Sequence, residues 1–478
     1  MRFLQPPPSH DLTYSDAFLV PSRSDVGSRM AVDLSPDDGT GATLPIVAAN
    51  MNSVTGPLLA ATLARRGGLA VLTQDHDVAD TIAAIAWVKD QPVTLASAQL
   101  ATEDELVADV LLRVPAVEGH GIVVVRDGRH VGAIGAVRLG HALPDARIGD
   151  LLHGSIDPLS PADVADPRAA FDAVHAAGVD FAAVVDDDGR VLGTVSPRTA
   201  LRGALYRPAL DDDGRLRVAV AVGINGDPAA KARALVDAGA DVVVIDTAHG
   251  HQEGMLRAIA AVRAAVDVPI VAGNVVTASA VRDLVDAGAD ILKVGVGPGA
   301  MCTTRMMTAV GRPQLSAVLE TAEEAIGLGA RVWADGGVRY PRDVALALAA
   351  GASSVMIGSW FAGTIEAPGR IQRDERGRLF KESWGMASTK AVEGRFGDLP
   401  AFELATKTLF AEGISSSTIL IDPNRPSVED LLDMITSGVR SSATYAGASS
   451  IVEFRERAVV GVQSAAGYEE GKALPVSW

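Results

Sequence analysis

The sequence predicts an α/β fold, a (β/α)8 TIM barrel with a second domain inserted into it. Eight short apolar runs rich in β-branched residues alternate with helical segments, and they lack the period-two pattern of a half-exposed strand. Such continuous runs are typical of parallel strands covered on both faces. Their spacing breaks once, between Leu72 and Leu216, where the gap is far longer than one crossover helix requires.

The eight expected strands are, in chain order, LPIVAA from Leu44, LAVL from Leu69, LRVAVAVG from Leu216, DVVVID from Asp241, VPIVAG from Val268, DILKV from Asp290, RVWAD from Arg331 and SVMIG from Ser354. In DAGADVVVID, DAGADILKV and AAGASSVMI, glycine follows a helical pattern and precedes a strand. Glycine at that place ends a helix and leads into the next strand. A doubly wound open sheet is the alternative with the same alternation.

The inserted segment contains an internal repeat. GIVVVRDGRHVGAI from Gly121 and FAAVVDDDGRVLGTV from Phe181 each read as strand, acidic glycine turn and strand. We therefore expect three parts: the first part of the barrel over 1–91, the inserted domain over 92–204, and the rest of the barrel over 205–478, where the stretch after Gly369 carries a mobile flap.

Composition excludes several classes of function. The formal charge of -17 and an aromatic content of 4% argue against nucleic acid as a partner. A single cysteine excludes an internal disulfide framework and a thiolate zinc cluster. The N-terminus lacks the apolar stretch of a secretory signal, and no apolar run is long enough to span a bilayer. We expect a cytoplasmic protein without a membrane partner.

Polar residues follow the expected strands, where the reactive groups of a (β/α)8 barrel lie. Asn50 follows the first strand, Asp246 ends the fourth, Asn274 follows the fifth and Asp335 ends the seventh. The HGHQE stretch after Asp246 lacks the i, i+4 histidine pair of a zinc helix, so a loop that contacts a cofactor is expected there. The acidic runs 186–188 and 211–213 precede glycines and are interpreted as solvated turns.

The sixth strand runs into GVGPGAMCTTR, residues 295–305, where three glycines allow a ligand to approach the backbone. As a GxGxxG fingerprint it is incomplete, because Ala300 occupies the last glycine position. A lone cysteine is ordinarily an inert buried residue. Cys302 lies instead on a polar, glycine-rich loop at the reactive end of the barrel, where a thiol is placed to attack an electrophilic carbon.

A nucleotide site is expected beside this loop. Asp335 can accept hydrogen bonds from both ribose hydroxyls, and the amides of Gly336 and Gly337 can bind phosphate. Gly358 and the Ser359 hydroxyl add two donors. Either motif alone could be a tight turn, but together with the cysteine loop they favour a nucleoside monophosphate.

The motifs GVGPGAMCTTR, IVAGNVVT, IDTAHGH, ADGGVRYPRDVALALAAGA and VMIGSWFAGT resemble the IMP dehydrogenase and GMP reductase family. The inserted repeat pair resembles the tandem CBS domains found at the same point in many members. The resemblance implies that Cys302 attacks purine carbon 2 to form a thioimidate. It also implies a potassium ion or another monovalent cation as a second cofactor beside a nicotinamide nucleotide.

The resemblance implies the remaining roles as well. The catalytic set is Cys302, Thr304 and Glu412; the substrate set is Asn274, Asp335, Gly336, Gly337, Gly358, Ser359, Gly385 and Met386; the cofactor set is Asp246, Thr247, Ala248, Gly295, Val296 and Gly297; the cation would take carbonyls of Gly297, Gly299 and Cys302. Homotetramers or homo-octamers are implied too.

Two reactions of the family share the thioimidate, and the sequence resembles the reductase. AANM at residues 48–51 and WGMAS at residues 384–388 resemble reductase motifs. Arg395 is followed by Phe396, and phenylalanine has no phenol with which to activate water as the Arg-Tyr pair of a dehydrogenase does. We therefore expect NADPH-dependent conversion of GMP to IMP and ammonia, in purine salvage.

Some residues depart from the family pattern. Asn52 stands where the family has Asp, Ala300 replaces a phosphate-contacting Ser, and Gln74 stands where a Lys is expected near the reacting base. In the second CBS-like repeat, Thr199 takes the position of a ribose-binding Asp. IMP dehydrogenase activity and a non-catalytic purine sensor are the alternatives.

Overall fold

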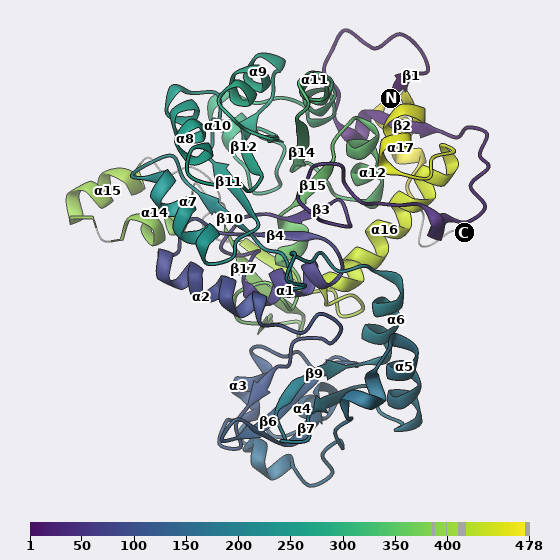
Figure 1. The fold of residues 1–478 in the computed structure, drawn as a ribbon, viewed down its shortest axis with the longest axis vertical. Coiled ribbons are helices and arrows are strands. Elements are labelled where there is room, and N and C mark those ends of the chain that lie inside the picture. Colours follow the sequence, from purple (N-terminus) through teal and green to yellow (C-terminus); the bar gives the residue numbers. More distant parts are fainter. Residues whose placement is uncertain (385–387, 398, 410–416, 474–478) are drawn as a thin grey trace.

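The computed structural model describes residues 1–384, 388–397, 399–409 and 417–473. Its centre is a closed parallel barrel with the strand order β10-β11-β12-β13-β14-β15-β3-β4 (Figure 1). The strands are β3 (Ile46–Ala48), β4 (Leu69–Leu72), β10 (Ala219–Val222), β11 (Val242–Asp246), β12 (Ile270–Val275), β13 (Ile291–Val294), β14 (Arg331–Asp335) and β15 (Ser354–Ile357). All eight expected strands are confirmed. The open-sheet alternative is wrong, because β4 pairs with β10 and closes the sheet.

Helices follow the barrel strands, and the longer ones cover their outer surface. They are α1 (Pro57–Arg65), α2 (Val78–Lys89), α7 (Pro228–Asp237), α8 (Glu253–Arg263), α9 (Ala278–Asp286), α10 (Thr304–Thr308), α11 (Gln314–Gly327), α12 (Pro341–Ala349) and α13 (Ser359–Ala362). Side-chain caps fix where some of them begin. Asp227 accepts from the Ala230 amide at the start of α7, and Thr277 accepts from the Ala280 amide at the start of α9.

Apolar side chains fill the inside of the barrel, so it is a packed core and not a pore. The largest of them is Trp333, which is fully buried and donates from Nε1 to Asp38 at 2.9 Å. The others include Val47, Leu69, Val71, Val242, Val244, Val271, Ile291 and Met356. This packing leaves polar side chains to the two ends of the barrel.

The segment between α2 and β10 forms a separate lobe below the barrel in Figure 1. Its repeats form two antiparallel hairpins, β6–β7 and β8–β9. The elements are β5 (Leu100–Ala101), α3 (Val107–Leu111), β6 (Gly121–Arg126), β7 (Arg129–Gly135), α4 (Ala136–His141), η3 (Ile148–Leu151), η4 (Pro161–Val164), α5 (Pro167–Ala176), β8 (Ala182–Val185), β9 (Val191–Val195) and α6 (Pro197–Leu205).

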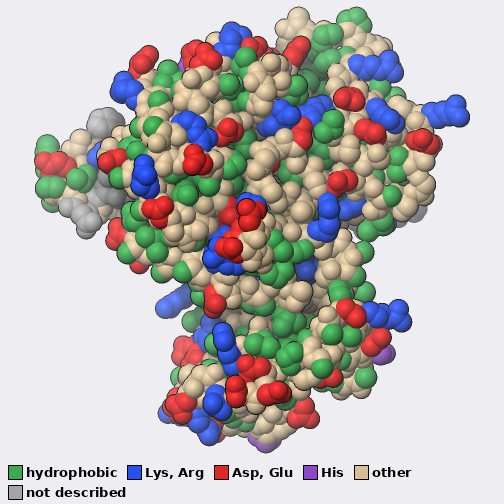
Figure 2. All heavy atoms as spheres, viewed as in Figure 1, with side chains coloured by type: hydrophobic (Ala, Val, Ile, Leu, Met, Phe, Trp, Pro, Cys, Tyr) green, Lys and Arg blue, Asp and Glu red, His purple; other side chains and the backbone are tan. Residues whose placement is uncertain are grey.

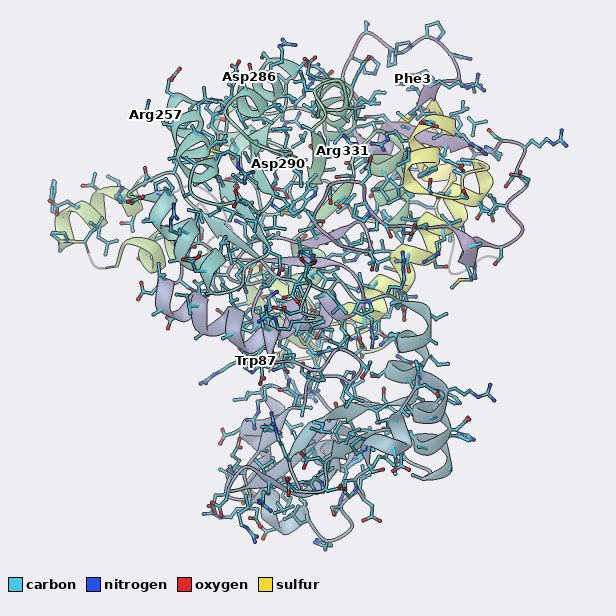
Figure 3. The ribbon with its side chains drawn as sticks, viewed as in Figure 1. Phe3, Trp87, Arg257, Asp286, Asp290 and Arg331 are labelled. Atoms are coloured by element: carbon cyan, nitrogen blue, oxygen red, sulfur yellow. The ribbon has the colours of Figure 1, made fainter. Side chains whose placement is uncertain are left out.

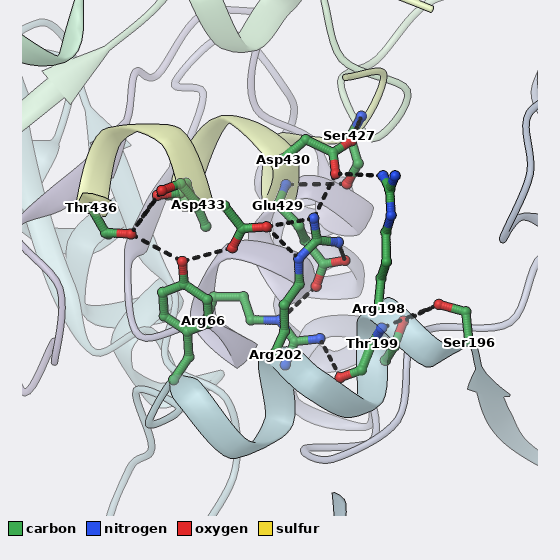
Figure 4. A network of polar contacts seen from close by, with 12 residues as sticks. Arg66, Ser196, Arg198, Thr199, Arg202, Ser427, Glu429, Asp430, Asp433 and Thr436 are labelled. Carbon is green, nitrogen blue, oxygen red and sulfur yellow. Dashed lines mark hydrogen bonds and ion pairs between the residues drawn. The ribbon is translucent and has the colours of Figure 1, made fainter. Parts of the chain in front are cut away.

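A network of mostly buried charges joins this lobe to the barrel (Figure 4). Arg202 on α6 contacts Glu429 at 3.1 Å, Asp430 at 2.5 Å and Asp433 at 2.8 Å, all on α16 (Val428–Tyr445). Arg66 Nε contacts Glu429 at 2.6 Å. Buried ion pairs of this kind fix orientation, since breaking one leaves an uncompensated charge.

The first strands of the chain pair with a strand from its last described segment. β1 (Arg2–Phe3), β19 (Val459–Val462) and β2 (Ala17–Val20) form one sheet, accompanied by η1 (Tyr14–Asp16), η2 (Arg29–Ala31), α17 (Ile451–Arg457) and α18 (Ala465–Glu470). The C-terminal segment therefore does more than carry a flap, because α16 packs along α12 of the barrel.

The stretch after Gly369 contains β16 (Gln372–Arg373), β17 (Leu379–Ser383), α14 (Thr389–Phe396), α15 (Ala401–Leu409) and β18 (Ser417–Leu420). The three strands form an antiparallel sheet, and α14 and α15 project to the left of the barrel in Figure 1. Side-chain interactions join this sheet to the barrel. Among them, Ser383 Oγ lies 3.0 Å from Ser53 Oγ, and Ser417 Oγ lies 3.7 Å from Met301 Sδ.

On the face drawn in Figure 2, Lys and Arg side chains are interspersed with Asp and Glu side chains instead of gathering into one basic surface. Among the described residues, no helix combines the length and the apolar character that crossing a membrane requires.

Candidate active site

Polar side chains gather at the carboxyl ends of the barrel strands. Asp246 ends β11, Asp335 ends β14, and Asn274 lies near the end of β12. Asp290 and Arg331, labelled in Figure 3, lie at the opposite end, where β13 and β14 begin. The structure thus brings these sequence-predicted residues to one end of the barrel, the end at which such barrels hold their reactive groups.

A buried lysine connects two of these carboxylates. Lys293 Nζ lies 2.9 Å from Asp246 Oδ1 and 2.9 Å from Asp335 Oδ2. Asn50 Nδ2 donates to Asp246 Oδ2 at 2.7 Å, and Asn274 Nδ2 donates to Asp335 Oδ2 at 2.9 Å. Sequence reasoning missed Lys293, because DILKV was interpreted only as a strand. A single charge inside an apolar run is the signal that would have identified it.

Asn274 has an unused acceptor. Its Nδ2 donates to the Gly295 carbonyl and to Asp335, but its buried Oδ1 has no hydrogen-bond partner among the described residues. An unpaired buried acceptor costs free energy unless a ligand donates to it. Asn274 is therefore well placed for the substrate contact expected of it.

Cys302 lies on the loop between β13 and α10, with its side chain exposed. Its Sγ donates to Thr304 Oγ1 at 3.2 Å. Its backbone amide donates to the Gly299 carbonyl at 3.0 Å, which closes the turn that presents the thiol. The thiol thus faces hydroxyls and solvent and is accessible to an electrophile.

Two glycines allow the thiol loop to lie against the Asp335 turn. A Cβ on Gly295 would be 2.1 Å from the Asp335 carbonyl oxygen. Gly336 has a φ of +87°, and a Cβ there would lie 3.2 Å from the Gly299 nitrogen. Side chains are excluded at both positions, so the backbone that holds the thiol directly adjoins the expected ribose and phosphate turn.

The expected phosphate donors come from neighbouring strands. Gly337 follows β14, and Gly358 and Ser359 follow β15, which pairs with both β14 and β3. A Cβ on Gly358 would lie 3.1 Å from Met51 Sδ, so Met51 after β3 borders the same space. Backbone amides from two adjacent turns can therefore approach one phosphate.

The expected cofactor residues lie on two loops at this end. Thr247 donates its amide to the Gly273 carbonyl at 3.0 Å and accepts from the Asn274 amide at 3.1 Å, which joins this loop to β12. Ala248 follows and is exposed. Val296 and Gly297 lie on the thiol loop, and the Val296 carbonyl accepts from the Arg312 amide at 3.2 Å.

A second lysine that the sequence reasoning missed reaches the loop after β4. Lys231 on α7 donates from Nζ to the Gln74 carbonyl at 2.9 Å. Burial lowers the pKa of Lys231, while Asp75 and Asp77 act to raise it. The position where the family resemblance expects a Lys holds Gln74, and the structure places an ammonium group from another helix on its backbone.

Several expectations fall outside the described residues. Gly385, Met386 and Glu412 lie outside them, and so do the side chains of Arg395 and Phe396. Their roles stay predictions.

The described residues contain no group of three or more His, Cys, Asp or Glu side chains that could hold a metal ion. His251 in the HGHQE stretch contacts Asp283 at 2.7 Å instead. The acidic turn 186–188 is solvated as expected, but the interpretation of 211–213 needs correction. Asp211 is 12% exposed and contacts Lys89 at 2.8 Å, because α2 passes beside that turn.

Comparisons with known proteins agree with this geometry. A profile described as the IMP dehydrogenase / GMP reductase domain matches residues 11–473. The chain is 52% identical over 481 residues to a GMP reductase of Mycobacterium tuberculosis (strain ATCC 25618 / H37Rv), covering 100% of both chains. It is 34% identical over 471 residues to an inosine-5'-monophosphate dehydrogenase of Nitrosopumilus maritimus, covering 96% of this chain and 97% of the relative.

Solved structures resemble the fold along nearly its full length. A GMP reductase variant from Trypanosoma brucei in complex with guanosine 5'-monophosphate superimposes with a TM-score of 0.70 at 30% identity, covering 99% of both chains. A second structure of the Trypanosoma brucei variant superimposes with a TM-score of 0.67 at 28% identity, covering 98% of this chain and 99% of the other.

Proposed function

The chain belongs to the IMP dehydrogenase / GMP reductase family, and from this premise we propose that it is a GMP reductase that converts GMP to IMP and ammonia. The observation that carries the proposal is the exposed Cys302 thiol, on a loop packed against the Asp335 turn. The full-length similarity to GMP reductases and the Arg395-Phe396 dipeptide both favour the reductase over the dehydrogenase.

The nucleotide is held from the side of β14 and β15. Asp335 accepts hydrogen bonds from the ribose hydroxyls, and the amides of Gly336, Gly337 and Gly358 with the Ser359 hydroxyl donate to phosphate oxygens. Asn274 uses its free carboxamide oxygen to accept from the substrate. These contacts would hold purine carbon 2 beside the thiol, which is the positioning that a covalent step requires.

Cys302 then acts as the nucleophile. Its thiol proton leaves toward Thr304 Oγ1, the atom to which the thiol already donates. The Sγ–carbon 2 bond forms, the bond from carbon 2 to the exocyclic amino group breaks, and the amino group takes up protons and departs as ammonia. Glu412 is proposed to supply a proton to this leaving group. When bound, NADPH would supply the hydride that carbon 2 accepts. The Sγ–carbon 2 bond would then break to give IMP, and Sγ would take up a proton from solvent to restore the Cys302 thiol.

The chain offers groups that fit the nicotinamide nucleotide. Asp246, Thr247 and Ala248 present a carboxylate and an exposed loop at the same end of the barrel as the thiol, and Gly295, Val296 and Gly297 border it. Lys231 adds a positive charge beside the loop after β4. We propose that Lys231 supplies the cation that Gln74 does not.

Backbone oxygens of the thiol loop fit a monovalent cation. The carbonyls of Gly297, Gly299 and Cys302 are neutral ligands of the kind that potassium accepts. The Gly299 carbonyl accepts one hydrogen bond from the Cys302 amide, and a carbonyl oxygen has a second lone pair. A cation here would stabilise the turn that presents the thiol.

The inserted lobe over 92–204 is proposed to be a tandem CBS pair. A cavity of about 990 Å³ lies between the lobe, the barrel and the β16–β18 sheet, bordered by Ser196, Thr199 and several arginines. Thr199, where many such repeats carry a ribose-binding Asp, lies 3.0 Å from the Ser196 hydroxyl. A homotetramer or homo-octamer and a cytoplasmic location complete the proposal.

Paired assays test the assignment. Purified full-length protein is expected to oxidise NADPH when GMP is added, to release ammonia, and to use NADH less well. Production of NADH from IMP and NAD, without NADPH oxidation on GMP, would assign the protein as an IMP dehydrogenase. A protein inactive in both assays whose thiol is not protected from alkylation by GMP would be a sensor. Native mass spectrometry and cell fractionation test the assembly and the location.

A further inference from the structure

The ion pairs of Lys293 hold one oxygen of the Asp335 carboxylate and leave the other open to a ligand. On Asp335, Oδ2 is held by both Lys293 and Asn274, whereas Oδ1 receives no hydrogen bond from the described residues. The Asp335 side chain is 21% exposed, while that of Lys293 is 3% exposed. The ammonium therefore holds the carboxylate from the core side and leaves Oδ1 to accept from a ligand.

The same ammonium holds Asp246. Oδ1 of that carboxylate pairs with Lys293 and Oδ2 accepts from Asn50, and each oxygen keeps a second lone pair for a ligand. Burial alone would lower the pKa of Lys293, but Asp246 and Asp335 outweigh that effect and raise it above the ordinary lysine value. The lysine thus stays charged and lies between two carboxylates that would otherwise repel each other across a partly buried space.

We propose that Lys293 is a positioning residue that serves both halves of the active site, orienting Asp335 for the nucleotide ribose and Asp246 for the nicotinamide nucleotide. The inference rests on the proposed function, which assigns those two contacts. Lys293 has no contact with Cys302 and belongs to the core of the barrel, so it acts on binding through the carboxylates and takes no part in the chemistry.

The fold contains a matched control. Lys89 also holds two carboxylates, Asp211 at 2.8 Å and Asp241 at 2.8 Å, and its side chain is 6% exposed. It lies at the other end of the barrel, because Asp241 precedes β11 whereas Asp246 ends it. Removal of either lysine deletes a buried double ion pair, but only one of the two pairs adjoins the site.

The experiment compares Lys293→Met, Lys293→Arg and Lys89→Met in the full-length chain. Dissociation constants for GMP and for NADPH are measured separately by titration without turnover, together with KM, kcat and thermal stability. Lys293→Met is expected to weaken both ligands roughly tenfold or more, with a smaller change in kcat. Lys293→Arg should recover most of both affinities, and Lys89→Met should lose stability with both affinities within about twofold of the parent.

Several outcomes would overturn the inference. If Lys293→Met bound GMP or NADPH as tightly as the parent does, a shared role would be contradicted. It would also be contradicted if Lys89→Met lost as much affinity as Lys293→Met. Lys293→Gln provides a second variant: if neither it nor Lys293→Met folds while Lys89→Met does, Lys293 is purely structural. Failure of the proposed function is distinct, since it would appear as absent GMP-dependent NADPH oxidation in the parent protein.

Discussion

The Cys302 thiol donates a hydrogen bond to the Thr304 hydroxyl at 3.2 Å, at an exposed position on the loop that follows β13. A structural cysteine would be packed among apolar side chains. Here the sulfur has a polar neighbour able to receive its proton and an open side on which a substrate can approach, which is the arrangement that the proposed nucleophile and proton path require.

Replacement of Cys302 by Ala is expected to abolish turnover, with GMP-dependent NADPH oxidation reduced by about 10³-fold or more, because no other group can form the covalent bond. Fold and GMP binding should be kept, since the side chain is exposed. Circular dichroism and equilibrium titration check both. Met306→Ala, at an 89% exposed position on α10, is the control and should remain active. Near-normal activity of Cys302→Ala would refute the covalent step.

Lys231→Met is expected to reduce GMP-dependent NADPH oxidation by roughly 10-fold to 100-fold, because it removes the positive charge beside the loop after β4. Arg233→Ala on the same helix is the control. Arg233 is exposed, and because it lies two residues after Lys231 it does not share the helix face of Lys231. Steady-state rates of the two variants, with melting temperatures to verify folding, give the comparison. If Lys231→Met and Arg233→Ala had equal rates, Lys231 would serve only to hold the Gln74 carbonyl.

The barrel could be predicted because its signal is local: each apolar run is itself a strand, and each preceding glycine itself ends a helix. The Asp335 turn and the thiol loop were predictable for the same reason, since both follow strands. Lys231 was not, because its role depends on α7 reaching a loop that lies more than 150 positions earlier in the chain. Asp211 was interpreted as solvated because nothing near it in sequence indicates Lys89.

Glu429→Gln is expected to destabilise the protein at neutral pH. Burial tends to raise the pKa of Glu429, but Arg66, Arg202 and Arg65 outweigh it and lower the pKa to about 2. A carboxyl group whose pKa is lower in the folded protein than in the unfolded chain stabilises the fold at pH values above its unfolded pKa of 4.5. This stabilisation is lost as pH falls toward 2. The variant also leaves buried arginines without a counter-charge, which costs about 3 kcal/mol or more.

Urea unfolding at pH 7 and pH 3 measures this effect. The difference in unfolding free energy between the parent and Glu429→Gln should shrink at the lower pH, where the parent has lost part of the ionised carboxylate's contribution. Asp172→Asn removes the exposed Arg168–Asp172 pair and should change little at either pH. A difference that stays constant with pH would mean that shape, and not charge, explains the role of Glu429.

The contribution of Glu366 to stability is expected to change with pH in the direction opposite to that of Glu429. Burial raises its pKa to about 7, although hydrogen bonds from Ser427 Oγ and the Val428 amide lower it in part. Between about pH 4.5 and pH 7 the folded protein keeps the proton while the unfolded chain releases it. Stability from this group is therefore complete below pH 4.5 and declines as pH rises, by about 3 kcal/mol in all.

Glu366→Gln keeps the shape and most hydrogen-bonding capacity of the protonated side chain but cannot ionise. Relative to the parent, the variant should gain unfolding free energy between pH 5 and pH 8, measured by urea titration at each pH. Glu375→Gln, at an exposed turn between β16 and β17, is the control and should have the same unfolding free energy as the parent at pH 5 and at pH 8. If Glu366→Gln shows the same pH dependence as the parent, Glu366 is already ionised in the fold at pH 5, and the start of α16 is held by a charged carboxylate.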